Sequence, residues 1–153
     1  MASYGRFALM IFCSTVAMYA LMFLNTYEAA HIHFSQTRFW MALLMGAAMA
    51  AIMLAFMLRM YQNRQRNLAI FMAAAIVFAG SLWLVRSQRT VDDVSFMRAM
   101  IPHHSIAIMT SERARISDPR VRKLADGIIA TQRREIAEME ALVGDIERNK
   151  AQR

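Results

Sequence analysis

The stretch FWMALLMGAAMAAIMLAFML, residues 39–58, decides the fold class because its 20 residues include no charged side chain. A helix rises 1.5 Å per residue, so about 20 apolar residues cross a hydrocarbon core of about 30 Å. Two more uncharged runs, at residues 7–27 and 68–85, are long enough to do the same. The pattern predicts three transmembrane helices, at about 7–27, 39–58 and 68–85.

The ends of the runs agree with this prediction. Aromatic residues favour the membrane interface, and four of them lie near the ends: Tyr27, Trp40, Tyr61 and Trp83. Arg6 before the first run is also typical of a secretory signal peptide. The apolar region of such a peptide is usually about 7–15 residues, shorter than this run, so we favour a membrane span.

The central run carries a ridge of methionines. Methionine recurs every fourth residue, at 41, 45, 49, 53 and 57, which traces one line along a helix. Gly46 and Ala50 lie between them, and small residues at this spacing let helices approach closely. A row of thioethers could pass copper(I), but methionine is also a common gap-filler in packed interiors. We favour packing as the role of this ridge.

The distribution of charge indicates a lipid partner. The chain has 153 residues, 58% of them hydrophobic, and a formal net charge of +7. Residues 1–90 hold seven arginines and one acidic residue, whereas residues 91–153 hold eleven basic and ten acidic residues. Arginines that bracket apolar runs match anionic lipid headgroups, whereas a nucleic-acid-binding domain gathers its basic residues on one folded face. We expect a lipid bilayer as partner and no nucleic acid.

The two sides would each hold four arginines, so the orientation depends on how densely the arginines cluster. The segment RMYQNRQR, residues 59–66, is the densest group and favours the cytoplasmic side, which puts the N-terminus inside. With three spans, the loop at 28–38 and everything after residue 85 share one compartment. His31 and His33 therefore face the same side as the later histidines.

After residue 85 the sequence predicts an extramembrane helix. The segment TVDD at residues 90–93 offers an N-cap and acidic residues in the first turn. A helix from about 91 to 116 follows. Pro102 inside it removes one backbone donor and predicts a bend.

A second extramembrane helix follows a short turn. The segment SDP at residues 117–119 predicts Asp118 as the cap and Pro119 as the first residue of a helix that reaches about 148. The predicted fold is all-α, with a membrane anchor at residues 1–88 and a helical hairpin domain at residues 89–153.

Methionine and histidine converge on the first of these helices. At 100° per residue, Met97, Met100 and His104 share one face, and His103 lies about a quarter-turn away unless the bend at Pro102 swings it back. Thioether and imidazole select copper(I), and methionine has no proton to lose on binding. The residues predict a copper site.

Two polar residues interrupt the apolar stripe of the last helix. Gln132 and Glu135 lie among Val121, Leu124, Ile128, Met139 and Leu142, where an unpartnered polar group costs about 1–3 kcal/mol. Either they orient metal-binding imidazoles from outside the ligand set, with Met139 as an extra ligand, or they hydrogen-bond His103 and His104 and lock the hairpin. The residues alone leave both interpretations open.

The segment HIH at residues 31–33 lies in the loop between the first two runs. We favour a solvated loop for His31 and His33, because loops are ordinarily exposed. They are the candidates for an additional metal site. Glu28 and His31 form one Glu-x-x-His unit, whereas helical di-iron proteins need two such units and two further Glu.

Residues 93–142 resemble the bacterial domain-of-unknown-function family numbered 305. The resemblance rests on F-M-x-x-M-x-x-H-H at residues 96–104 and Q-x-x-E-I-x-x-M at residues 132–139. It implies a ferritin-like helical fold, a subgroup with a three-helix membrane anchor, and copper binding by Met and His in some members. Secreted relatives imply a periplasmic hairpin on a bacterial inner membrane. Longer members repeat the two-helix unit, so a single unit implies a homodimer or docking on a larger membrane complex.

We therefore expect a membrane-anchored protein that binds or handles copper(I) on the periplasmic side. The alternative is a structural or accessory membrane subunit whose hairpin mediates dimerisation or docking. The chain shows no Ser/His/Asp arrangement, no glycine-rich phosphate loop and no clustered carboxylate pair, so we do not expect an enzyme.

Overall fold

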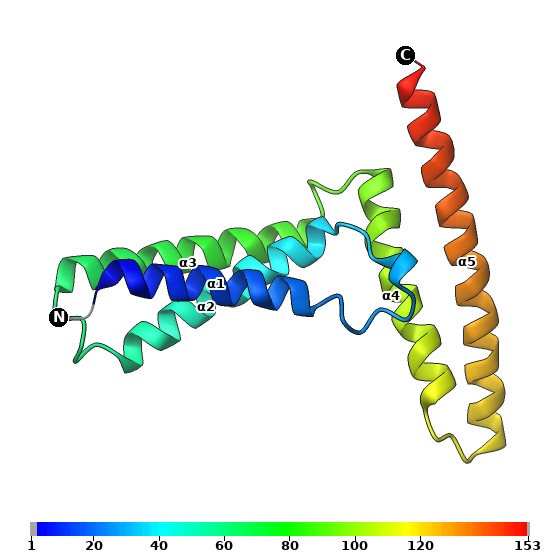
Figure 1. Cartoon of the computed structure of the whole chain (residues 1–153), viewed down its shortest axis with the longest axis horizontal. Coiled ribbons are helices and arrows are strands. Elements are labelled where there is room, and N and C mark those ends of the chain that lie inside the picture. Colours follow the sequence, from blue (N-terminus) through cyan, green and yellow to red (C-terminus); the bar gives the residue numbers. More distant parts are fainter. Residues whose placement is uncertain (1–2, 153) are drawn as a thin grey trace. The chain divides into compact units, whose positions relative to one another are not determined.

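The computed structural model describes residues 3–152. Within them the chain forms five α-helices and one 3-10 helix, with no strand (Figure 1). The all-α prediction is confirmed for these residues. In chain order the elements are α1 (Tyr4–Leu21), η1 (Ala29–His31), α2 (Gln36–Phe56), α3 (Arg64–Ser87), α4 (Asp93–Arg113) and α5 (Pro119–Ala151).

The chain divides into two compact units. The anchor unit comprises the chain up to Met22 together with Thr37–Thr90, and the hairpin unit comprises Phe23–Gln36 together with the chain from Val91 onward. The three helices of the anchor unit are each long and apolar enough to span a membrane. The loop between α1 and α2 therefore belongs with α4 and α5.

The first helix is shorter than the sequence predicts. A helix to Tyr27 is wrong, because α1 ends at Leu21 and Met22 is its C-cap. The backbone N–H of Tyr27 donates to the Ser105 hydroxyl at 3.0 Å. This bond draws the chain into the hairpin unit, and no local sequence signal reveals it.

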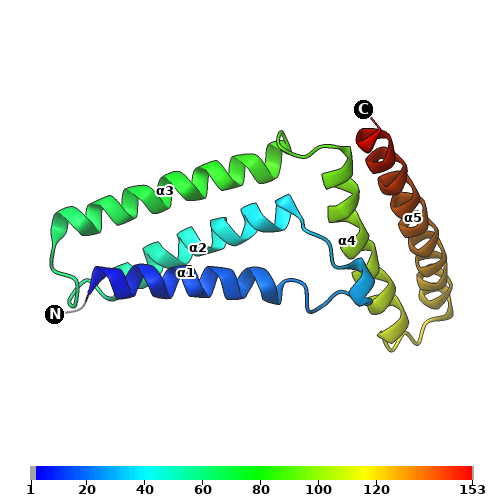
Figure 2. The same ribbon diagram turned by 45° about the horizontal axis from the view of Figure 1, so that its top comes forward.

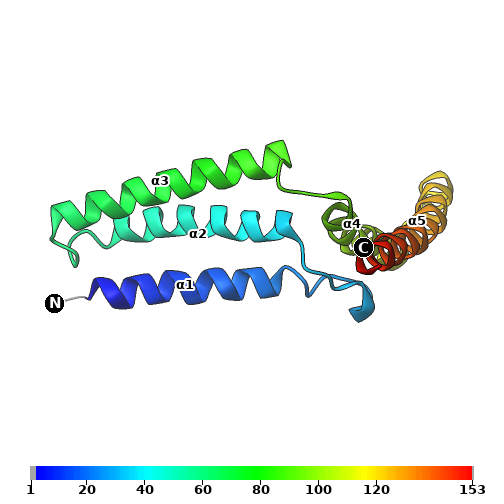
Figure 3. The same cartoon turned by 90° about the horizontal axis from the view of Figure 1, so that it is seen from above.

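The helices of the anchor unit run alongside one another (Figures 2 and 3). Phe7, Leu54 and Tyr61 form the core of this unit, and Met53 and Met57 of the methionine ridge pack against it. These two methionines are therefore packing residues, as we favoured for the ridge.

A polar cluster lies near the N-terminal ends of α1 and α3. The Tyr4 hydroxyl donates to Asn67 Oδ1 at 2.8 Å, and Asn67 Nδ2 donates to the Tyr61 carbonyl oxygen at 2.6 Å. Asn67 is buried, so these bonds satisfy an amide that would be costly to bury alone.

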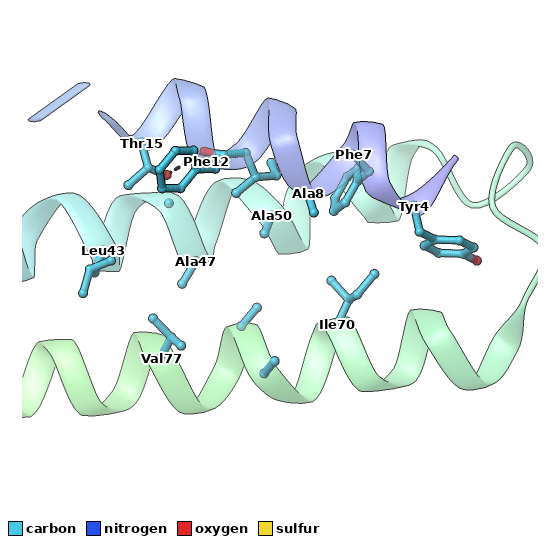
Figure 4. Close-up of a pocket in the computed structure, with 14 residues that line it drawn as sticks. Tyr4, Phe7, Ala8, Phe12, Thr15, Leu43, Ala47, Ala50, Ile70 and Val77 are labelled. Atoms are coloured by element: carbon cyan, nitrogen blue, oxygen red, sulfur yellow. Dashed lines mark hydrogen bonds between the residues drawn. The ribbon is translucent and has the colours of Figure 1, made fainter. Parts of the chain in front are cut away.

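An apolar groove opens between the three helices (Figure 4). It has a volume of about 390 Å³. Its labelled walls include Phe7 and Phe12 from α1, Ala47 from α2, and Ile70 and Val77 from α3.

Gly46 marks the close approach of α1 and α2. A Cβ atom at this position would lie 2.3 Å from Thr15 Oγ1 and 3.1 Å from Thr15 Cγ2. The Thr15 hydroxyl also donates to the Ile11 carbonyl oxygen at 2.8 Å, which limits how far it can move. The sequence prediction of close helix packing through small residues is confirmed at Gly46.

Gly46→Ala is expected to destabilise the anchor unit by about 1–3 kcal/mol, as overpacking does. Thermal unfolding in detergent measures this loss. Gly80→Ala is the matched control, since a Cβ there meets nothing within 4 Å. Thr15→Ala combined with Gly46→Ala should recover most of the loss, and failure to recover it would contradict the assigned contact.

In the hairpin unit, α4 and α5 run antiparallel (Figure 2). Ile101, Ile108 and Ile136 form its core, and Ile129 and Met139 pack against them. Along the pair, the order of contacts reverses: Arg98 contacts Glu147, His104 contacts Glu135, and Glu112 contacts Arg133.

The predicted start of α5 is confirmed, whereas α4 begins at Asp93, two residues later than predicted, because Asp92 is its N-cap. Asp92 accepts the Ser95 backbone N–H at 2.8 Å, and Asp118 accepts the Arg120 backbone N–H at 2.8 Å. Hydrogen bonds from Ser95 lower the pKa of Asp92, and the Arg120 side chain and N–H lower the pKa of Asp118. Pro119 occupies the first turn of α5 as predicted.

Candidate functional site

The centre of the candidate site is His104 on α4. Its Nδ1 lies 2.9 Å from the Met100 carbonyl oxygen, and its Nε2 lies 2.9 Å from Glu135 Oε2 on α5. A carbonyl oxygen only accepts, so Nδ1 carries a proton and donates it. The contact between Nε2 and the Glu135 carboxylate connects α4 to α5.

The role of Glu135 differs in detail from the one the sequence suggests. In one of the two interpretations left open by the sequence, Glu135 orients an imidazole from outside the ligand set. In the structure the Met100 carbonyl oxygen fixes the ring through Nδ1, and Glu135 contacts the opposite nitrogen. This is the contact of the hydrogen-bonding interpretation, and it occupies the nitrogen that a metal would use.

The other residues predicted for the metal site differ in how far they are buried. Met97 is buried and Met100 is half-buried, whereas His103 is exposed. The rings of His103 and His104 have centroids 6.2 Å apart. His103 therefore lies beside the His104–Glu135 pair on its solvent side.

On α5, Met139 and Gln132 flank Glu135 at a spacing of about one turn. Met139 packs against the isoleucine core of the hairpin unit. Gln132 is half-buried and lines a shallow groove on α5. Within residues 3–152, Gln132 makes no hydrogen bond to either imidazole of α4. The structure thus brings together His104, Met100 and Glu135.

His31 is buried, so the prediction of a solvated loop is wrong for this residue. It is 8% exposed, and its Nδ1 lies 3.0 Å from the Ser105 hydroxyl oxygen. Its Nε2 lies 3.9 Å from a carboxylate oxygen of Glu28 and 3.9 Å from one of Glu140. The loop is buried here because Ser105 gives it a hydrogen-bonding partner on α4.

His33 is half-buried, and its enclosed Nε2 has no hydrogen-bonding partner among residues 3–152. Burial lowers the pKa of His33, and the positive charge of Arg98 lowers it further. The ring is therefore held in its neutral form more strongly than an exposed histidine.

The sequence analysis did not identify two residues that make contacts in the hairpin unit, Ser105 and Glu112. Ser105 is fully buried and holds both the Tyr27 N–H and His31. The Tyr27 hydroxyl donates to Glu112 at 2.7 Å, and Arg133 donates to the other carboxylate oxygen at 2.6 Å. The bond to Glu112 raises the pKa of Tyr27.

A signal for Ser105 was present in the sequence. It continues the apolar stripe of Ile101 and Ile108 at helical spacing, so it is a polar residue where a core residue is expected. The same reasoning pointed to Glu135 on α5. Tyr27 gave no such signal, because an aromatic residue at the end of an apolar run suggests the membrane interface.

Among residues 3–152, no three His, Cys, Asp or Glu side chains converge as a metal-binding group. One chain supplies one imidazole and one carboxylate at the His104–Glu135 pair. Any metal held there depends on thioether ligands or on residues from outside the chain.

These features define a helical protein with three potential membrane-spanning helices and a Met/His/Glu cluster on a separate helix pair. Residues 93–153 match the family model described as Domain of unknown function (DUF305). Over 140 residues, the chain is also 31% identical to the protein "Uncharacterized protein L153" of Acanthamoeba polyphaga mimivirus, which covers 90% of each chain. The chain belongs to the DUF305 family. No solved structure matches it.

Proposed function

We propose that this protein anchors a copper(I)-binding helix pair to a membrane and has no catalytic role. The observation that carries the proposal is the setting of His104, whose Nδ1–H donates to the Met100 carbonyl oxygen at 2.9 Å. Imidazoles that bind metals are commonly oriented by such a bond, which leaves the other nitrogen for the metal. Here that nitrogen is Nε2, which contacts Glu135 Oε2 at 2.9 Å, so a bound cation would replace this contact.

The donor types around His104 fit a soft cation. A cation at Nε2 would lie beside the Glu135 carboxylate, whose negative charge would favour it. Met100 lies one turn before His104 and Met97 nearly one turn further. Their thioethers prefer copper(I) over harder ions and bind without losing a proton.

The remaining candidates have subsidiary roles under this proposal. His103 and Met139 are further ligands, and Gln132 is a polar neighbour that orients the ligand set. His31 and His33 are the candidates for an additional metal site.

The proposal includes a location and an architecture. The hairpin unit would face the periplasm of a bacterial inner membrane, with the N-terminus in the cytoplasm. The arginine cluster at residues 59–66 and the secreted relatives that the resemblance implies support this orientation. The α4–α5 pair would be half of a ferritin-like four-helix bundle.

A second candidate is a structural or accessory membrane subunit whose hairpin unit mediates docking. Leu124 on α5 is 65% exposed, and large exposed apolar surfaces mark interaction sites. The His104–Glu135 bond would then serve only to hold α4 and α5 together.

Competition titration of the full-length protein in detergent with copper(I) and a chromophoric chelator tests the proposal. The Met97→Leu/Met100→Leu variant is expected to bind copper(I) at least about tenfold more weakly, a loss of about 1.4 kcal/mol, because leucine keeps the volume and removes the sulfur. Met53→Leu/Met57→Leu in the anchor unit is the matched control and should leave the affinity unchanged.

Equal affinity in the Met97→Leu/Met100→Leu variant and the wild type would contradict the metal site. Unchanged metal content in His103→Ala/His104→Ala, together with loss of a co-purifying protein, would support the accessory subunit.

A further inference from the structure

Helix α5 carries a second apolar face besides the one packed on α4. Leu124 is 65% exposed, Ile128 is 36% exposed and Leu142 is 46% exposed, and Ile146 is half-buried. We call these four residues the outer face of α5. At 100° per residue, all four lie within about 20° of Glu135 around the helix axis.

The outer face is distinct from the core of the hairpin unit. Ile129 and Ile136, which belong to that core or pack against it, lie about 100–120° from Glu135 around the same axis. Met139, which also packs against the core, lies between these residues and Glu135, at about 40°. A helix that packs against one neighbour needs one apolar stripe. A second apolar line along the same helix therefore requires a second partner.

The outer face is symmetric about Glu135. Glu135 is the middle residue of α5 (Pro119–Ala151). Ile128 and Leu142 are each seven residues from it, and Leu124 and Ile146 are each eleven residues from it. In a two-fold antiparallel pair, a residue before the axis meets the residue equally far after it on the partner. The spacing therefore suits a second copy of this helix.

Such a pair places the two Glu135 carboxylates opposite each other at the two-fold axis, each with its own His104. Two facing carboxylates repel unless a cation or protons lie between them. One chain supplies too few ligands, since among residues 3–152 no three His, Cys, Asp or Glu side chains converge. Two copies supply two imidazoles and two carboxylates, together with Met100 from each copy.

We propose that two copies pair antiparallel through the outer face of α5 and thereby complete one shared cation site. The site consists of His104 and Glu135 from both copies, with Met100 as the soft donor. This inference rests on the proposed function for the identity of the cation, but the pairing itself does not.

The groove at the turn end of the hairpin unit fits this pairing. It is lined by Ser111 and Ala114 of α4 and by Leu124 and Ile128 of α5, among others. Leu142 and Ile146 of the second copy would cover Ile128 and Leu124 beside this groove. Pairing would bury apolar surface that is otherwise exposed, at about 25 cal/mol per Å².

Disulfide cross-linking tests the pairing. In a Cys13→Ser background, the full-length double variant Ile128→Cys/Leu142→Cys is expected to form disulfide-linked dimers under mild oxidation. Neither single variant should do so, because residues 14 apart on a helix are separated by about 21 Å and a disulfide needs Cα atoms within about 7 Å. The same separation prevents a bond within one chain.

Light scattering of the wild type in detergent and the copper(I) stoichiometry complete the test. A dimer that binds one copper(I) per two chains supports the inference. Absence of cross-linking in the double variant, together with a monomeric wild type that binds one copper(I) per chain, overturns it and leaves the proposed function intact. Cross-linked dimers that bind no copper(I) support the pairing and contradict the proposed function.

Discussion

Replacing Ile101 by alanine is expected to lower the free energy of unfolding of the hairpin unit by about 2–5 kcal/mol. Ile101 is 1% exposed and lies in the core with Ile108 and Ile136. Truncating it removes buried methyl groups and leaves a cavity that the neighbouring helices fill only in part. Hydrogen exchange of the α4 and α5 amides, measured on the full-length protein in detergent, reports this loss.

Ile106→Ala is the matched control, because it makes the same chemical change in the same helix at a half-buried position outside the core. Its cost should be clearly smaller. Equal losses in the two variants would mean that α4 does not pack through Ile101. The His104–Glu135 bond should weaken in Ile101→Ala, since the spacing between α4 and α5 depends on this core.

Helix starts could be predicted from the sequence where they depend on adjacent residues. Asp92 caps α4 through Ser95, and Asp118 caps α5 through Arg120. Each partner is two or three residues away, so the sequence alone contains the whole interaction. The path of the chain after α1 could not be predicted in this way, because Tyr27 bonds to Ser105, which is 78 residues away in the sequence.

The candidate site could be predicted in part. Glu135 in an apolar stripe must find a partner, and that reasoning led to the imidazoles of α4. The Met100 carbonyl oxygen as the partner of His104 Nδ1 was not predicted, because a backbone acceptor leaves no mark in the sequence. Which ring nitrogen of His104 faces α5 depends on the rotation of its side chain. The spacing of residues in the sequence does not determine that rotation.

The burial of His31 shows that a polar loop sequence does not always mean an exposed loop. Loops are exposed because their backbone groups need water, but here Ser105 supplies both a backbone contact and a side-chain contact. One polar residue in the core of the hairpin unit therefore holds the loop that follows α1.

Ser105→Ala is expected to release this loop from α4. Ser105 is fully buried, accepts the Tyr27 N–H at 3.0 Å and contacts His31 Nδ1 at 3.0 Å. Alanine leaves both groups without this partner, which costs about 1–3 kcal/mol of stability for each group. Faster hydrogen exchange of the Tyr27 amide and its neighbours measures the release. Ser111→Ala, a half-buried serine further along α4, should leave that exchange unchanged.

The same variant separates two interpretations of His31. The His104–Glu135 bond does not involve Ser105, so under the proposed function Ser105→Ala should open the loop and retain the copper(I) affinity. If the affinity falls together with the opening of the loop, His31 belongs to the metal site. If neither changes, the Ser105 hydroxyl does not hold the loop, and the burial of His31 must come from its contacts with Glu28 and Glu140.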